Sequence, residues 1–155
     1  ALGKIGLPLA VQFADKGHHV IGADLDQRVV DLVNAGEEPF PGEHQLAEKL
    51  AAAVKDGRLR ATTDTASAVA DSEAVVLVVP LFVDAEGVPD FRAMDSATRA
   101  VAAGLKPGTL VSYETTLPVG TIDPTRASSG SPLFQSSRHL RSCSLVVPGS
   151  SPINV

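Results

Sequence analysis

One run of residues restricts the fold of this chain more than any other feature. Residues 74–79 are apolar without interruption, so a strand there is buried on both faces, as in the centre of a parallel sheet. Predicted strands cover residues 19–23, 59–62, 74–79 and 109–113. Predicted helices cover about 6–16, 29–33, 46–54, 65–70 and 91–105. This alternation predicts the α/β class, with a doubly wound parallel sheet.

The first residues of the chain have the spacing of a dinucleotide-binding turn. Gly3 would let the backbone approach a pyrophosphate, and Gly6 would let the next helix pack closely on the sheet. Lys4 and Ile5 complete the turn, whose helix N-terminus offers unpaired N–H groups. Ala1 occupies the first glycine position of the usual G-x-G-x-x-G pattern, and no residues precede it to form a strand. We therefore expect a Rossmann-like sheet that lacks its first strand, while the glycine pair alone is also compatible with an ordinary turn.

An acidic residue follows the second predicted strand at the expected interval. Asp24 lies 21 residues after Gly3, close to the spacing of about 20 between the turn and the ribose-binding acid. A 2′-phosphate at ~4 Å from that carboxylate would be repelled by roughly 4 kcal/mol at an effective dielectric constant near 20. Arg28 is either a phosphate partner or a solvated side chain of the next helix. These residues predict NAD as the cofactor in preference to NADP.

The composition excludes several classes of partner. A net charge of −5 argues against a nucleic-acid or anionic-membrane surface, which would need a basic face. No apolar stretch reaches the ~18 to 20 residues of a membrane span, and we expect a cytoplasmic protein. A single cysteine, Cys143, cannot form an internal disulfide or a zinc cluster. We expect no metal site, because Asp84, Glu86 and Asp90 have the pattern of solvated loop acids.

The last part of the chain, residues 122–155, differs in composition from the rest. It holds nine serines and four prolines, and its three arginines and one aspartate give a net charge of +2. Such a stretch cannot readily offset its ordering entropy. We expect one domain over residues 1–121 and a disordered or non-native tail over 122–155, the alternative being a basic interaction tail.

Four segments together resemble a known family. They are residues 3–8 with Asp24, residues 34–39 with 58–64, residues 78–80 with Val83, Asp84 and Gly87, and residues 114–121. In order and spacing they are similar to the N-terminal NAD-binding domain of the UDP-glucose/GDP-mannose dehydrogenase family, and within it to the UDP-N-acetylmannosamine dehydrogenase branch.

The resemblance implies a cytoplasmic enzyme of polysaccharide biosynthesis. Such an enzyme oxidises the C6 alcohol of a nucleotide sugar, UDP-N-acetylmannosamine or UDP-glucose, to a carboxylate with two NAD in succession. Thr116 matches the family threonine that lies close to the nicotinamide, although a strand-end threonine that bonds to the backbone is an equal reading. Val79 and Pro80 match the segment over the cofactor. A homo-oligomer is implied only for the full-length enzyme.

The catalytic groups of the family are not matched. Nothing after Thr121 resembles its acid/base glutamates, and Cys143 does not lie in the glycine-rich setting of its nucleophile. The loop at 39–43, which includes Glu43, is either a cover for the cofactor or a surface turn. We expect this chain alone to be inactive. Two other readings remain, a dehydrogenase of the 3-hydroxy acid type and a non-catalytic nucleotide-binding module.

Overall fold

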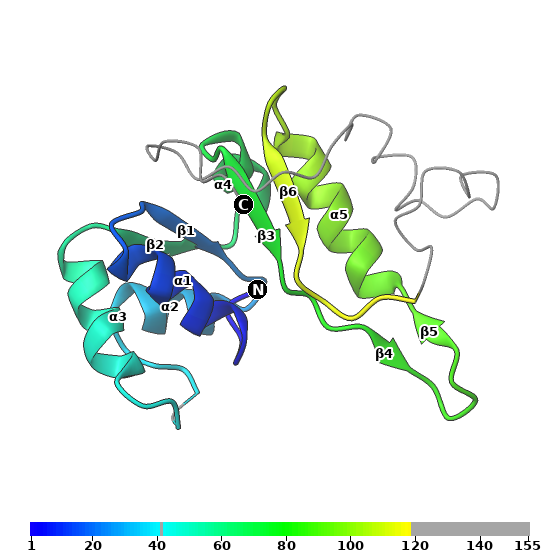
Figure 1. Cartoon of the computed structure of the whole chain (residues 1–155), viewed down its shortest axis with the longest axis horizontal. Coiled ribbons are helices and arrows are strands. Elements are labelled where there is room, and N and C mark those ends of the chain that lie inside the picture. The colour runs from blue at the N-terminus through cyan, green and yellow to red at the C-terminus, as the bar shows by residue number, and fades with distance from the viewer. Residues whose placement is uncertain (41, 119–155) are drawn as a thin grey trace, which may run out of the picture. The chain divides into compact units, whose positions relative to one another are not determined.

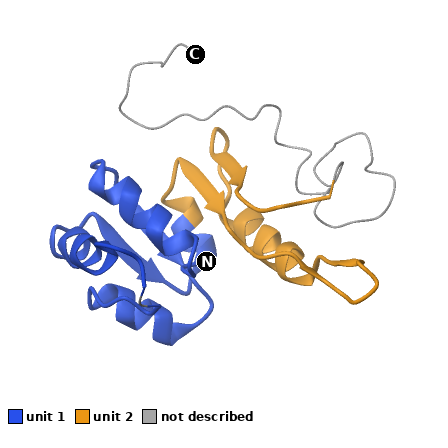
Figure 2. Ribbon diagram, turned by 60° about the horizontal axis from the view of Figure 1, so that its bottom comes forward, with its two compact units in different colours: residues 1–68 blue, residues 69–155 orange. Residues whose placement is uncertain are grey.

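The computed structural model describes residues 1–40 and 42–118. The chain divides into two compact units, residues 1–68 and residues 69–155 (Figure 2). The expected boundary at 121, the tail over 122–155 and Cys143 lie outside the described residues. Each unit is built around its own parallel strand pair.

The first unit contains helices α1 (Gly6–Asp15), α2 (Gln27–Asn34) and α3 (Leu46–Lys55) and strands β1 (Val20–Ala23) and β2 (Leu59–Thr62). The two strands lie side by side and are parallel (Figure 1). Val20 is opposite Leu59, and Ala23 is opposite Thr62. Helix α4 (Thr65–Ala70) follows β2 and crosses the boundary between the units.

Local sequence explains where the first helices begin and end. Pro8 lies in the first turn of α1, where its missing N–H is not needed for an intrahelical bond. Asp26 caps α2, because its carboxylate accepts the Arg28 N–H at 2.9 Å and so satisfies one of the free donors of the first turn. Gly36, at φ +76°, ends that helix in the left-handed conformation that glycine adopts without strain.

One apolar core holds the first unit together. Leu7, Val33, Leu50 and Leu59 are all at most 2% exposed and belong to a single cluster that joins the three helices to the strand pair. The outer edge of β2 is covered by a side chain. The Asn34 amide donates to the Ala61 carbonyl at 3.0 Å, and its oxygen accepts the Ala61 N–H at 2.7 Å.

The second unit contains strands β3 (Ala74–Leu77), β4 (Phe82–Val83), β5 (Pro89–Asp90) and β6 (Leu110–Tyr113) and helix α5 (Arg92–Gly104). Strands β3 and β6 are parallel, with Ala74 opposite Leu110, and α5 lies beside them (Figure 1). Among residues 69–118, a smaller cluster of four buried residues forms the core: Val69, Leu77, Val101 and Val111. The strands β4 and β5 form a short antiparallel hairpin.

The α/β class and the parallel pairing are confirmed. In the doubly wound order 3-2-1-4-5-6, strands 3 and 2 are neighbours and strands 4 and 5 are neighbours. The pairs β1–β2 and β3–β6 correspond to these two neighbouring pairs, and each forms a two-stranded sheet. Strand β3 ends at Leu77, two residues before the end of the predicted run, and the hairpin was not predicted.

Candidate cofactor site

The glycine turn presents three backbone donors without partners. The Leu7 N–H donates to the Gly3 carbonyl at 3.0 Å and the Leu9 N–H to the Ile5 carbonyl at 3.3 Å, which closes the first turn of α1. The N–H groups of Lys4, Ile5 and Gly6 donate to no other described group. Unpaired N–H groups at a helix N-terminus are the donors that bind phosphate in dinucleotide sites.

Gly3 is not required by packing inside the protein. A Cβ added there would meet no atom within 4 Å, and the residue is not among those with positive φ. A side chain at this position would therefore obstruct only a molecule outside the turn. The open space agrees with the predicted approach of a pyrophosphate to the backbone.

Asp24 lies directly after β1 and is bonded to the glycine turn. One carboxylate oxygen accepts the Leu2 N–H at 2.7 Å, and the other accepts the Asp26 N–H at 2.9 Å. The Asp24 N–H donates to the Thr62 carbonyl at 3.1 Å, which extends the β1–β2 pair. The structure thus brings together the acid and the turn that sequence spacing paired.

Two residues that hold the turn were missed by the sequence reasoning. These residues are Leu2 and Gly22. Leu2 is 2% exposed, and its side chain packs directly on Gly22, where an added Cβ would lie only 2.6 Å from the Leu2 Cδ2 atom. A glycine inside an apolar strand indicates a close approach by another segment. That signal was available at Gly22.

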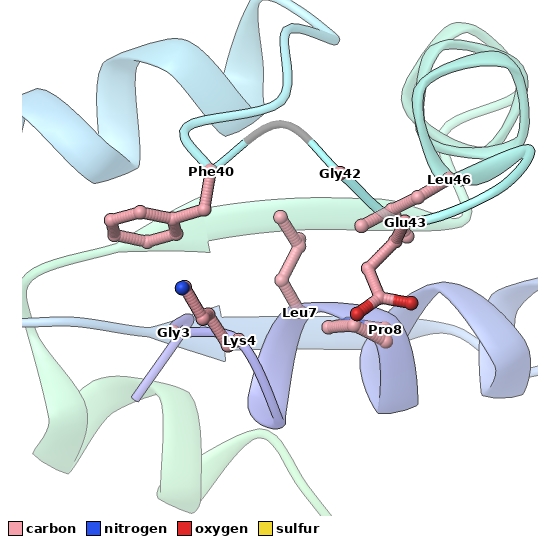
Figure 3. A pocket seen from close by; sticks show the side chains of 8 residues that line it. All are labelled: Gly3, Lys4, Leu7, Pro8, Phe40, Gly42, Glu43 and Leu46. Atoms are coloured by element: carbon pink, nitrogen blue, oxygen red, sulfur yellow. The ribbon is translucent and has the colours of Figure 1, made fainter.

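A hollow of about 240 Å³ opens beside the turn (Figure 3). The buried side chains of Leu7 and Leu46 are among those that line it. The side chains of Lys4 and Phe40 point toward one another across it, and Glu43 lies above Pro8 (Figure 3). The described part of the predicted 39–43 loop therefore includes residues that form one wall of this hollow. The remaining lining residues are Gly3 and Gly42.

Arg28, in the first turn of α2, and Ile5, in the glycine turn, are both exposed. The Arg28 guanidinium forms no ion pair or side-chain hydrogen bond with any described residue, while its backbone N–H is held by Asp26. Ile5 is 68% exposed. Both side chains are free to contact a ligand.

In the second unit, the predicted site residues follow the ends of parallel strands. Val79 and Pro80 come after β3, and Thr116 comes after β6. The Glu114 N–H donates to the Leu77 carbonyl at 2.9 Å and continues the pair. Thr116 is exposed, and both interpretations of this residue, the contact with the cofactor and the bond to the backbone, stay predictions.

The acids of the hairpin have local partners. Asp84 accepts the N–H groups of Glu86 at 3.1 Å and Val88 at 2.7 Å, and Asp90 pairs with Arg92. Within residues 1–40 and 42–118, no group of three or more histidine, cysteine or acidic side chains is placed to hold a metal ion. In that same part of the chain, no helix is long and apolar enough to cross a membrane.

Comparison with known proteins identifies the family. The profile of the UDP-glucose/GDP-mannose dehydrogenase family, NAD binding domain, matches residues 1–133. The UDP-N-acetyl-D-mannosamine dehydrogenase of Escherichia coli is 40% identical over 122 residues, 79% of this chain and 28% of the relative. The NDP-N-acetyl-D-galactosaminuronic acid dehydrogenase of Ralstonia nicotianae is 41% identical over 123 residues, with the same coverage of both chains.

Solved structures agree with that result. A GDP-mannose dehydrogenase from Pseudomonas aeruginosa superposes with a TM-score of 0.77 at 26% identity, over 88% of this chain and 31% of that one. A UDP-glucose dehydrogenase from Pyrobaculum islandicum gives 0.75 at 31% identity, over 88% and 30%. The chain thus spans less than a third of the length of these relatives. The chain belongs to the UDP-glucose/GDP-mannose dehydrogenase family. It corresponds to the NAD-binding domain of these dehydrogenases, and its cofactor is NAD.

Proposed function

We propose that this chain is the NAD-binding part of a dehydrogenase that oxidises the C6 alcohol of a UDP-sugar, UDP-N-acetylmannosamine or UDP-glucose, to the uronate. Family membership and the substrates named for the relatives support this substrate class. The reaction would prepare sugars for polysaccharide biosynthesis in the cytoplasm. The substrate partner is the nucleotide sugar, and a homo-oligomer is proposed for the full-length enzyme.

The observation that carries the proposal is a turn with three free N–H groups and with empty space beside Gly3. This turn is joined to Asp24 by the hydrogen bond that the Leu2 N–H donates. In this proposal, Lys4, Ile5 and Gly6 bind the pyrophosphate through their N–H groups. Each Asp24 oxygen accepts one backbone hydrogen bond and retains a lone pair for a ribose hydroxyl. NAD, when bound, accepts a hydride from the alcohol carbon.

Further contacts are proposed for residues that the sequence singled out. Arg28 lies near the ribose acid and contacts the adenosine part of the cofactor, and Val79, Pro80 and Thr116 contact the cofactor from the ends of β3 and β6. The acidic net charge of −5 supports the absence of nucleic-acid and membrane partners. The domain is proposed to cover residues 1–121, with 122–155 as a tail.

The chain alone is proposed to be inactive. Oxidation of an alcohol to a carboxylate by this route needs a base and a cysteine nucleophile as well as NAD. The described residues contain no cysteine. That observation also favours a second candidate function, a nucleotide-binding module without catalysis of its own.

Calorimetric titration of the purified chain with NAD and NADP tests the cofactor site. We expect NAD to bind at least tenfold more tightly, because the Asp24 carboxylate repels a 2′-phosphate. The Asp24→Asn variant should lower the NAD:NADP affinity ratio, and the Asp31→Asn variant, which removes a charge on the exposed side of α2, should leave it unchanged. Equal affinities in the parent chain would contradict the assignment of Asp24. Formation of NADH from a UDP-sugar by this chain alone would refute the proposed inactivity.

A further inference from the structure

The position of the phosphate-binding turn is fixed by two residues of another segment. Leu2 immediately precedes Gly3, and its N–H donates to an Asp24 carboxylate oxygen at 2.7 Å. Its side chain, 2% exposed, fits against Gly22, where a Cβ would approach the Leu2 Cδ2 atom to 2.6 Å. One residue of the turn segment is thereby held by both its main chain and its side chain.

The two holding residues lie on the same side of the chain. Gly22 and Asp24 are two positions apart at the end of β1, and residues spaced by two in an extended strand face the same way. The second Asp24 oxygen accepts the Asp26 N–H at 2.9 Å, which limits rotation of the carboxylate. The acceptor that meets Leu2 is therefore itself fixed in place.

We propose that Asp24 is a positioning residue for the phosphate-binding turn, in addition to its contact with the ribose. Through Leu2 it sets where the free N–H groups of Lys4, Ile5 and Gly6 point, so its removal weakens the binding of the phosphates themselves. Gly22 serves the same function by leaving room for the Leu2 side chain. This inference rests on the cofactor site proposed above.

A positioning role and a ribose-only role predict opposite effects on an anion without a ribose. A carboxylate close to a phosphate site repels it, so loss of the charge alone should strengthen anion binding. Loss of the Leu2 anchor should weaken binding, because hydrogen-bond donors gain their full value only when they are already oriented. The sign of the change separates the two roles.

The experiment measures the affinity of inorganic pyrophosphate and of NAD for the parent chain and three variants. We expect Asp24→Ala to weaken pyrophosphate binding at least fivefold, and Asp31→Asn, the matched charge control, to change it less than twofold. Gly22→Ala retains the ribose-binding carboxylate and displaces Leu2, so it should also weaken pyrophosphate binding. Circular dichroism checks that each variant is folded.

A second measurement does not depend on a ligand. In the folded variants, the backbone amides of Gly3 and Gly6 should show increased mobility by ¹⁵N relaxation with Asp24→Ala and Gly22→Ala but not with Asp31→Asn. The positioning role is overturned if pyrophosphate binds Asp24→Ala as tightly as the parent, or if these amides keep their parent mobility. Failure of the parent chain to bind NAD would count against the proposed function, whereas the amide measurement would still decide the positioning role. If Asp24→Ala does not fold, Gly22→Ala decides it.

Discussion

Four of the described aspartates bond to the backbone next to them. Asp24, Asp26, Asp84 and Asp90 each accept the N–H of the residue two positions later. Such turns satisfy backbone donors where a strand or loop ends and a new element begins. This local role explains why the hairpin acids, Asp84 and Asp90, are occupied by protein groups and do not converge on one point.

The pair Asp90–Arg92 leads to a prediction of pH dependence. The Arg92 guanidinium and N–H both donate to Asp90, and these bonds lower the pKa of that carboxyl from 3.8 to about 2. Since the folded pKa is depressed, the contribution of this pair to stability is present above pH 3.8 and is lost as the pH falls through about 2. We expect the ¹³C carboxyl signal of Asp90 to titrate with a midpoint near that lower value. In Arg92→Ala the midpoint should rise toward the ordinary value, and an unchanged midpoint would contradict the assigned cause.

Sequence spacing predicted the pairing of Asp24 with the glycine turn, because the interval between them follows from the length of one helix and one strand. It did not predict that Leu2 would bond to Asp24 or fit against Gly22. That contact depends on how two segments some 20 residues apart pack, and no periodicity of a single segment encodes it. The same reason applies to the hollow that Phe40 and Leu46 line together with the turn.

At the scale of elements, three of the four predicted strands were placed to within one residue at each end, whereas β3 ends two residues early. Strand β2 occupies the predicted residues 59–62, and β1 and β6 differ from prediction by one residue at one end. The hairpin was missed because strands of two residues, Phe82–Val83 and Pro89–Asp90, are too short to show an alternating pattern. The side chain of Asp84 and the positive φ of Gly87 shape its turn.

The Asn34 side-chain amide links α2 to β2, so its removal should lower the free energy of unfolding. Asn34→Ala should leave both the N–H and the carbonyl of Ala61 without their side-chain partner, and an unmet buried group costs about 1–3 kcal/mol. Denaturant unfolding of the first unit should show a loss in that range. Gln27→Ala, which removes an exposed i,i+4 contact on the same helix, should cost about 0.2–0.5 kcal/mol. Equal losses for the two variants would show that the strand edge does not depend on Asn34.

At the scale of the whole molecule, the described residues form two apolar cores that share no residue. The first cluster contains 13 buried residues, all within residues 1–68. The second contains four, all within residues 69–155. Contiguous cooperative units often open separately when their buried contacts are separate. The residues proposed to bind the cofactor through their N–H groups, Lys4, Ile5 and Gly6, and the acid Asp24 all belong to the unit with the larger core.

This division predicts that a core substitution acts on one unit only. Leu50 is fully buried in the first cluster, so Leu50→Ala should destabilise that unit by about 2–5 kcal/mol through lost contacts and a residual cavity. Native-state hydrogen exchange should show faster exchange for amides of β1 and β2 and unchanged exchange for β3 and β6. Val101→Ala, in the second cluster, is the reciprocal control and should accelerate β3 and β6 alone. Equal acceleration of all four strands by either variant would mean that the two cores unfold as one cooperative unit.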